Sequence, residues 1–221
     1  MGTTGRVVVG CVLLCAAVWS QEKPRELRGG GHVLGESAEQ FFSTGSVGEL
    51  VRACEARDWK TVKSLAKTAG SESKVNAKEI CEKTVKVKEQ ATSGAHQEYV
   101  GSDKEMMRTD TFTLDGGYLV KIRMIYASPI ADIEGFHPKT FEELFVGLRD
   151  AYGEPSKSYS ESVVSAYGVR RDAHRAIWVG KENVISISEQ PGENGRTEIV
   201  AETLAEYKRE AQAPKTANPL H

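Results

Sequence analysis

The chain has 221 residues, of which 29 are basic, 31 are acidic and 7% are aromatic, and its mean hydropathy is −0.40. The near-neutral charge balance excludes a protein that binds nucleic acid through a strong basic excess. A chain of this size is long enough to bury one ordinary hydrophobic core.

Residues 1–20 have the three regions of a secretory signal peptide. Arg6 provides the positive charge, an apolar run covers 7–19, and polarity returns at Ser20. The run is shorter than the roughly 20 residues of a membrane-spanning helix, which favours a cleaved signal over an uncleaved anchor. Cys15 follows two leucines, which does not fit a lipoprotein signal. We therefore expect a periplasmic or extracellular protein with no integral membrane span after cleavage.

Removal of the signal peptide leaves two cysteines, Cys54 and Cys81. In an oxidising compartment a disulfide between them is favoured over two separately buried thiols. Closing a loop of this size stabilises a fold by about 3 to 4 kcal/mol through lost chain entropy.

The segment 21–32 contains Pro24 and three consecutive glycines but almost no apolar residue, which predicts a flexible linker. A single domain is expected over 33–210, followed by a disordered tail at 211–221.

Helices are predicted first in this domain, a short one after residue 37 and three between 46 and 92. The disulfide would tie the first of these three to the last. Eight lysines and four glutamates between 60 and 90 indicate a solvated helix surface, with contact to an anionic envelope polymer as the alternative. The expected capping residues are Ser37 with Gln40, Ser46 with Glu49, Asp58, and Asn76 with Glu79.

From residue 106 the apolar period changes from that of a helix to two. Residues 118–126 place alternate apolar side chains on one strand face, and the glycine turn at 115–117 joins them to 109–114 in a β-hairpin. Four further strands are predicted at 163–167, 176–179, 184–188 and 197–201.

A helix is predicted between the hairpin and these strands. Thr140 and Glu143 form a capping box, and the apolar residues from Phe141 to Tyr152 make one stripe before Gly153 ends the helix. The chain therefore predicts an α+β fold, an antiparallel β-meander of about five or six strands packed on the helix 141–152. A disulfide-tied helical region precedes this sheet.

No catalytic, metal or cofactor motif in the sequence stands above chance. The five histidines lack metal-ligand spacing, and Asp132, Glu134 and His137 in one loop come nearest to a cation site. The charged cluster 170–175 could hold a carboxylate or phosphate, but it is typical of a hairpin turn. The histidines are His32, His96, His137, His174 and His221.

The residues thus favour a non-catalytic binding or scaffold module of the cell envelope that meets another envelope or extracellular protein. No cofactor and no nucleic-acid partner are expected. The alternative is an exported hydrolase whose site is assembled from dispersed residues, around His137 or His174.

Several short motifs follow one another in a characteristic order, and this order resembles a group of uncharacterised secreted bacterial proteins over about residues 33–202. The resemblance implies an α+β fold and an exported location, and it supplies no activity and no site residues. The helix start and the Gly-x-Pro stop are also weakly similar to those of SmpA/OmlA-like outer-membrane lipoproteins, where the two lie closer together. The motifs are Gly35-Glu36-Ser37, the stretch from Cys54 to Cys81, Phe112-Thr113-Leu114-Asp115-Gly116-Gly117-Tyr118-Leu119, Tyr152-Gly153-Glu154-Pro155, and Trp178.

Overall fold

The structure is a computed structural model. The expected signal peptide and the loop that carries Asp132, Glu134 and His137 lie outside the residues it describes. The described residues are 27–68, 76–103, 106–127, 139–164, 168, 170–190 and 196–213.

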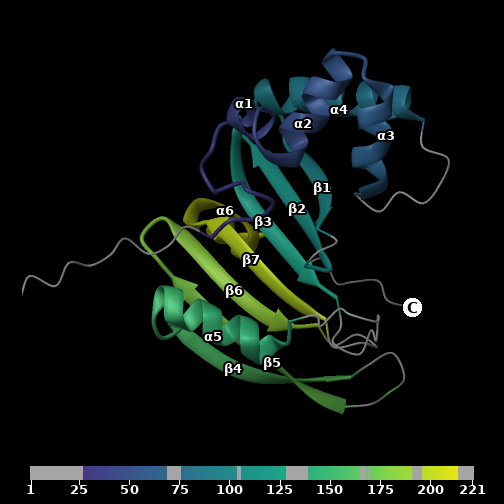
Figure 1. The fold of residues 1–221 in the computed structure, drawn as a ribbon. Coiled ribbons are helices and arrows are strands. Elements are labelled where there is room, and N and C mark those ends of the chain that lie inside the picture. Colours follow the sequence, from purple (N-terminus) through teal and green to yellow (C-terminus); the bar gives the residue numbers. More distant parts are fainter. Residues whose placement is uncertain are drawn as a thin grey trace, which may run out of the picture.

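Within these residues the chain forms six helices and one seven-stranded sheet (Figure 1). The helices are α1 (Ala38–Phe41), α2 (Gly45–Glu55), α3 (Trp59–Thr68), α4 (Ala77–Thr92), α5 (Phe141–Tyr152) and α6 (Leu204–Gln212). The strands are β1 (Gln97–Asp103), β2 (Arg108–Asp115), β3 (Tyr118–Tyr126), β4 (Lys157–Val164), β5 (Arg170–Val179), β6 (Asn183–Glu189) and β7 (Thr197–Thr203).

The sheet is wholly antiparallel, in the order β1-β2-β3-β7-β6-β5-β4. Two meanders, β1 to β3 and β4 to β7, are thus joined where β3 pairs with β7. The α+β class is confirmed, but the sheet has seven strands, not five or six. The additional strand is β1, an edge strand whose exposed residues follow no apolar alternation and therefore leave no clear period in the sequence.

The charged cluster 170–175 is strand, not a hairpin turn. These residues begin β5 and pair with most of β4, from Val164 opposite Arg170 to Tyr159 opposite Arg175. Backbone pairing with β4 makes them extended, although their side chains have the composition of a turn. The strand predicted at 163–167 correspondingly starts earlier, at Lys157.

One face of the sheet is covered by helices and carries the hydrophobic core. Helix α5 lies over β5 and β6, where Phe145 contacts Trp178 with 5.9 Å between ring centroids (Figure 1). At the other end α1 packs on β3, and Phe41 meets Phe112 at 5.2 Å. The predicted packing of the helix 141–152 on the sheet is therefore confirmed.

The predicted disulfide between Cys54 and Cys81 is present and joins α2 to α4, with 5.3 Å between the Cα atoms. Around it Leu50, Val62 and neighbouring alanines form a second, smaller apolar cluster, separate from the main core. The disulfide therefore holds together helices whose own core is small. It is also compatible with an exported protein.

Helix starts follow the predicted capping residues with one exception. The capping boxes at Ser37 and Thr140 form, and Asn76 caps α4. Helix α2 instead begins at Gly45, with Thr44 as its N-cap, so Ser46 lies inside the helix and not at its cap.

Part of the segment assigned to a linker is packed against the core. Gly29 and His32 exchange two backbone hydrogen bonds, of 3.1 and 2.8 Å. The His32 side chain is fully buried 4.2 Å from the Phe41 ring, and its Nδ1 lies 2.6 Å from Glu36 Oε1. Ordered packing therefore begins before residue 33.

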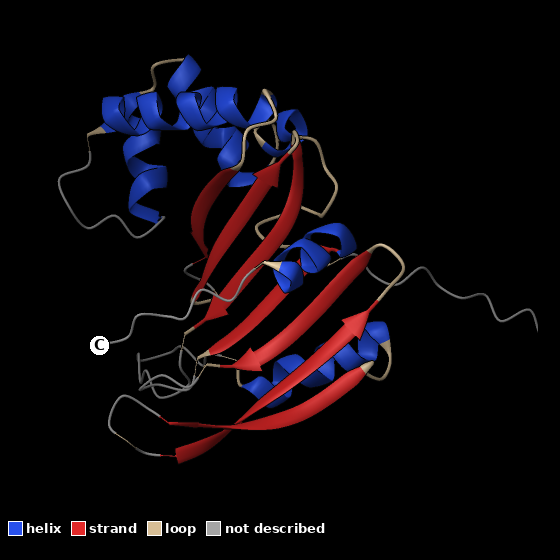
Figure 2. Cartoon of the chain, turned by 180° about the vertical axis from the view of Figure 1, so that it is seen from behind, coloured by secondary structure: helices blue, strands red, loops and turns tan. Residues whose placement is uncertain are grey.

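The opposite face of the sheet is open except for α6, which crosses it near β3 and β7 (Figure 2). Thr203 accepts a hydrogen bond from the Glu206 amide and so starts α6 directly at the end of β7.

Candidate functional site

The open face of the sheet carries a polar groove that follows from strand alternation. On β3 the apolar residues Ile122 and Met124 point into the core, so Lys121 and Arg123 point to the other side. Register places Lys121 opposite Glu202 of β7. The same alternation repeats on each neighbouring strand, which lines one continuous polar surface.

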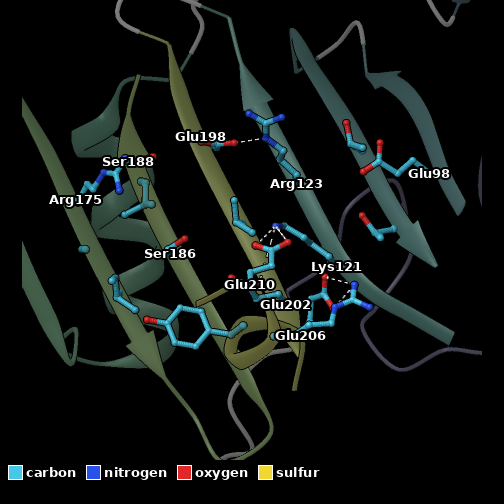
Figure 3. Close-up of a pocket in the computed structure, with 18 of the residues that line it drawn as sticks. Glu98, Lys121, Arg123, Arg175, Ser186, Ser188, Glu198, Glu202, Glu206 and Glu210 are labelled. Carbon is cyan, nitrogen blue, oxygen red and sulfur yellow. Dashed lines mark hydrogen bonds and ion pairs between the residues drawn. The ribbon is translucent and has the colours of Figure 1, made fainter. Parts of the chain in front are cut away.

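The groove encloses about 780 Å³ and is lined by all seven strands together with α6 (Figure 3). That volume falls in the range of roughly 300 to 1,000 Å³ typical of ligand sites. Its acidic residues are Glu98, Glu198, Glu202, Glu206 and Glu210, and its lysine and arginine residues are Lys121, Arg123, Arg175 and Arg209.

Ion pairs hold most of the cationic side chains in place. Lys121 Nζ donates to both carboxylate oxygens of Glu210, at 2.7 and 2.8 Å, and thereby ties β3 to α6 (Figure 3). Arg123 forms an ion pair with Glu198 of the neighbouring strand β7. Arg209 donates to Glu206 at 2.8 Å. The groove is thus organised before any ligand arrives.

Besides Glu206, which is paired with Arg209, the buried carboxyl among the residues that line this surface is Glu202. Its side chain is 8% exposed, its nearest charged partner is Lys121 Nζ at 3.9 Å, and within the described residues its Oε2 has no hydrogen-bond partner. Burial raises the pKa of Glu202 to about 7, Lys121 opposes this rise, and Glu210 and Glu206 add to it. Near neutral pH this group can therefore either donate or accept a hydrogen bond.

The far end of the groove is rich in hydroxyl groups. Arg175 of β5 pairs in register with Ser188 of β6, and Ser186 lies on the same face (Figure 3). The Arg175 side chain is 46% exposed, and its ion pair with Glu161 is long, at 3.9 Å. Tyr159 of β4 lies opposite Arg175 and lines the same end. The Arg175 guanidinium thus remains accessible to a ligand.

Of the histidines singled out in the sequence, His137 and His221 lie outside the described residues, and the other three do not meet in one site. His174 Nδ1 lies 2.9 Å from Ser160 Oγ, but both residues are exposed and neither lines the groove. His96 does line it, near Asp115 at 3.9 Å. Across the described part of the chain, no group of three or more His, Cys, Asp or Glu residues is arranged to hold a metal ion.

Of the charged cluster 170–175, only Arg175 reaches the groove, and the disulfide lies apart in the helical region. Sequence reasoning did not identify Glu202 or the α6 residues as a site. The available signal was the polar side of the strand 118–126, where Lys121 and Arg123 alternate with apolar residues. No helix in the described ranges combines the length and hydropathy needed to cross a membrane.

The chain matches no protein-family model, no curated protein and no solved structure with which it was compared.

Proposed function

We propose that the protein is an exported, non-catalytic binding module of the cell envelope and that the polar groove is its binding surface. The observation that carries this proposal is the groove of about 780 Å³ on the sheet face that α6 crosses, lined by residues from every strand. The Cys54–Cys81 disulfide supports an oxidising compartment.

The groove has the properties of a surface that binds rather than one that reacts. Its side chains are held by ion pairs such as Lys121 with Glu210, and preorganised groups lose little conformational freedom when a ligand binds. Among the described residues that line it, no nucleophile and base lie within hydrogen-bond distance of each other.

The alternative, an exported hydrolase, has one supporting observation, the 2.9 Å contact between Ser160 and His174. Glu189 accepts a hydrogen bond from the backbone N–H of His174, and within the described residues no carboxylate accepts one from the His174 ring to orient it as in a triad. A fluorophosphonate probe tests this alternative. Labelling that disappears in Ser160→Ala would favour the hydrolase, and absence of labelling would favour the binding module.

Photo-crosslinking in the native envelope tests the binding surface directly. A benzophenone amino acid is introduced at Thr111 or Ser186, both in the groove, and at Val146, which is 41% exposed on α5 across the sheet. We expect a discrete adduct from the two groove positions and none from Val146. Equal adducts from all three positions, or none from the groove, would refute the proposal.

A further inference from the structure

The shape of the groove indicates an elongated ligand. Its lining residues extend from Glu98 on β1 to Tyr159 on β4, the two edges of the sheet. Adjacent strands are about 4.8 Å apart, so six intervals correspond to roughly 29 Å measured along the sheet. The interior strands already pair with both neighbours. A ligand lying across them must therefore be recognised by side chains and not by strand addition.

The charges of the groove argue for a ligand without net charge. Five glutamates and four lysine or arginine residues line it, and three of the four cations are already paired at short range. A polyanion such as nucleic acid requires a basic excess, which this surface lacks. A polycation would meet Arg175 and the other cations, and an apolar ligand would remove the ion pairs from water without compensation.

The hydrogen-bonding capacity of the groove is not exhausted by its internal pairs. A carboxylate offers about four acceptor positions and a guanidinium about five N–H donors, so a paired ion can still bind neighbouring hydroxyl groups. Thr111, Thr113, Ser186 and Ser188 each add one donor and two acceptors to the same face. A ligand dense in hydroxyl groups satisfies both kinds of partner without displacing any ion pair.

Two features mark where such a ligand would be held. Glu202 lines the groove, and its buried Oε2 has no hydrogen-bond partner in the described part of the chain, so a side-chain rotation that brings the carboxyl to a ligand hydroxyl would supply one. Tyr159 and Tyr207 are half-buried at the lining, from β4 and α6. Lys157 Nζ lies 4.5 Å from the centroid of the Tyr159 ring, so stacking there uses the face that Lys157 leaves open. The face of an aromatic ring packs well on the C–H face of a sugar ring.

From these observations we infer that the groove binds a neutral glycan strand lying across the sheet. The inference rests on the proposed function, because it names the ligand class of that same site. It places ring stacking at Tyr159 and Tyr207, and hydroxyl recognition at Glu202, Arg175 and the serine residues beside it.

Titration of the purified exported protein with defined hexasaccharides tests the inference. The neutral probes are the hexamers of β-1,4-glucose, α-1,4-glucose and N-acetylglucosamine, and the anionic probe is the galacturonic acid hexamer. We expect at least one neutral hexamer to bind, with a Kd that changes less than about two-fold between low and high salt because no net charge is neutralised. We expect the galacturonate hexamer to bind more weakly.

Two tyrosines provide a matched pair of variants. Tyr159→Ala removes a ring from the groove and should weaken glycan binding by about ten-fold or more. Tyr118→Ala removes a 56% exposed ring outside the groove and should leave the Kd unchanged. Ser188→Ala, which removes only the hydroxyl group, should weaken binding as well and serves if Tyr159→Ala fails to fold.

The inference is overturned if no neutral hexamer binds, if the galacturonate hexamer binds most tightly, or if Tyr159→Ala binds as the wild type does. These results are distinguishable from failure of the proposed function. Groove crosslinks to a protein, without glycan binding, would overturn the glycan inference alone, whereas absence of any groove-specific crosslink would overturn both.

Discussion

Replacing Glu202 by Gln isolates the effect of burying a carboxyl at the base of the groove. In the folded protein burial raises the pKa of Glu202 from 4.5 to about 7. Between these values the folded state binds more protons than the unfolded state, so the free energy of unfolding falls as pH rises. The loss is complete above the folded pKa. At about 1.4 kcal/mol per pH unit it reaches about 3 kcal/mol, and water in the groove reduces it to about 1–3 kcal/mol.

Glutamine has nearly the same shape but does not ionise, so Glu202→Gln should lose this part of the pH dependence. Lys121, Glu206 and Glu210, which face Glu202 from β3 and α6, are present in both proteins, and the difference between the two curves therefore reports Glu202 together with its coupling to these groups. Urea unfolding followed by tryptophan fluorescence should give similar free energies near about pH 5. Near about pH 8 the variant should be more stable by about 1–3 kcal/mol.

Glu98→Gln is the matched control, because Glu98 lines the same groove but is exposed. It should retain the wild-type change in unfolding free energy between acidic and alkaline pH. A Glu202→Gln variant that follows the wild-type curve, or that is less stable than wild type near about pH 8, would refute the argument from burial.

Three further predictions concern the stability of the fold, each measured by urea unfolding. Replacing both Cys54 and Cys81 by Ala should lower the free energy of unfolding by about 3–4 kcal/mol because a 27-residue loop is no longer closed, and a loss below about 1 kcal/mol would contradict that account. Gly147→Ala in α5 should stabilise the protein by about 0.5–1 kcal/mol, since an added Cβ meets no atom within 4 Å and alanine favours helix. Gly48→Ala in α2 should destabilise it despite the same helix preference, because the added Cβ would lie 2.4 Å from the backbone carbon of Ser43, and a stabilised variant would disprove this clash.

Local features of this fold could be predicted because they depend on neighbours in the sequence. The stripe from Phe141 to Tyr152 matches the structure, and so does the alternation over 122–126, since one period of side chains decides which face is buried. At 118–119 the predicted alternation is wrong, because the register shifts opposite Leu114, and Tyr118 is exposed while Leu119 is buried. The edge strand β1 was missed for the converse reason, because neither face of Gln97–Asp103 carries an apolar series. His32 was assigned to a linker because the glycines before it indicate flexibility and a single buried side chain leaves no periodic pattern in the sequence.

The candidate site could be predicted only in part from the sequence. Lys121 and Arg123 could be placed on the polar side of their strand, but their partners could not be identified. Lys121 binds Glu210, which lies 89 positions further along the chain, and Arg123 binds Glu198, 75 positions further. Pairings of such separation depend on which strands become neighbours in the sheet, and no local pattern reports that.

The sequence by itself determined the α+β class, the disulfide pair, the helix over 141–152 and the polar side of β3. These follow from short-range periodicity, capping and the chemistry of two cysteines in an oxidising compartment. The tertiary structure alone decided that β3 pairs with β7 and that α6 lies across the open face. This arrangement buries Glu202 and assembles the groove, because the hydration and charge environment of a side chain are properties of the surfaces brought against it, not of the residue itself.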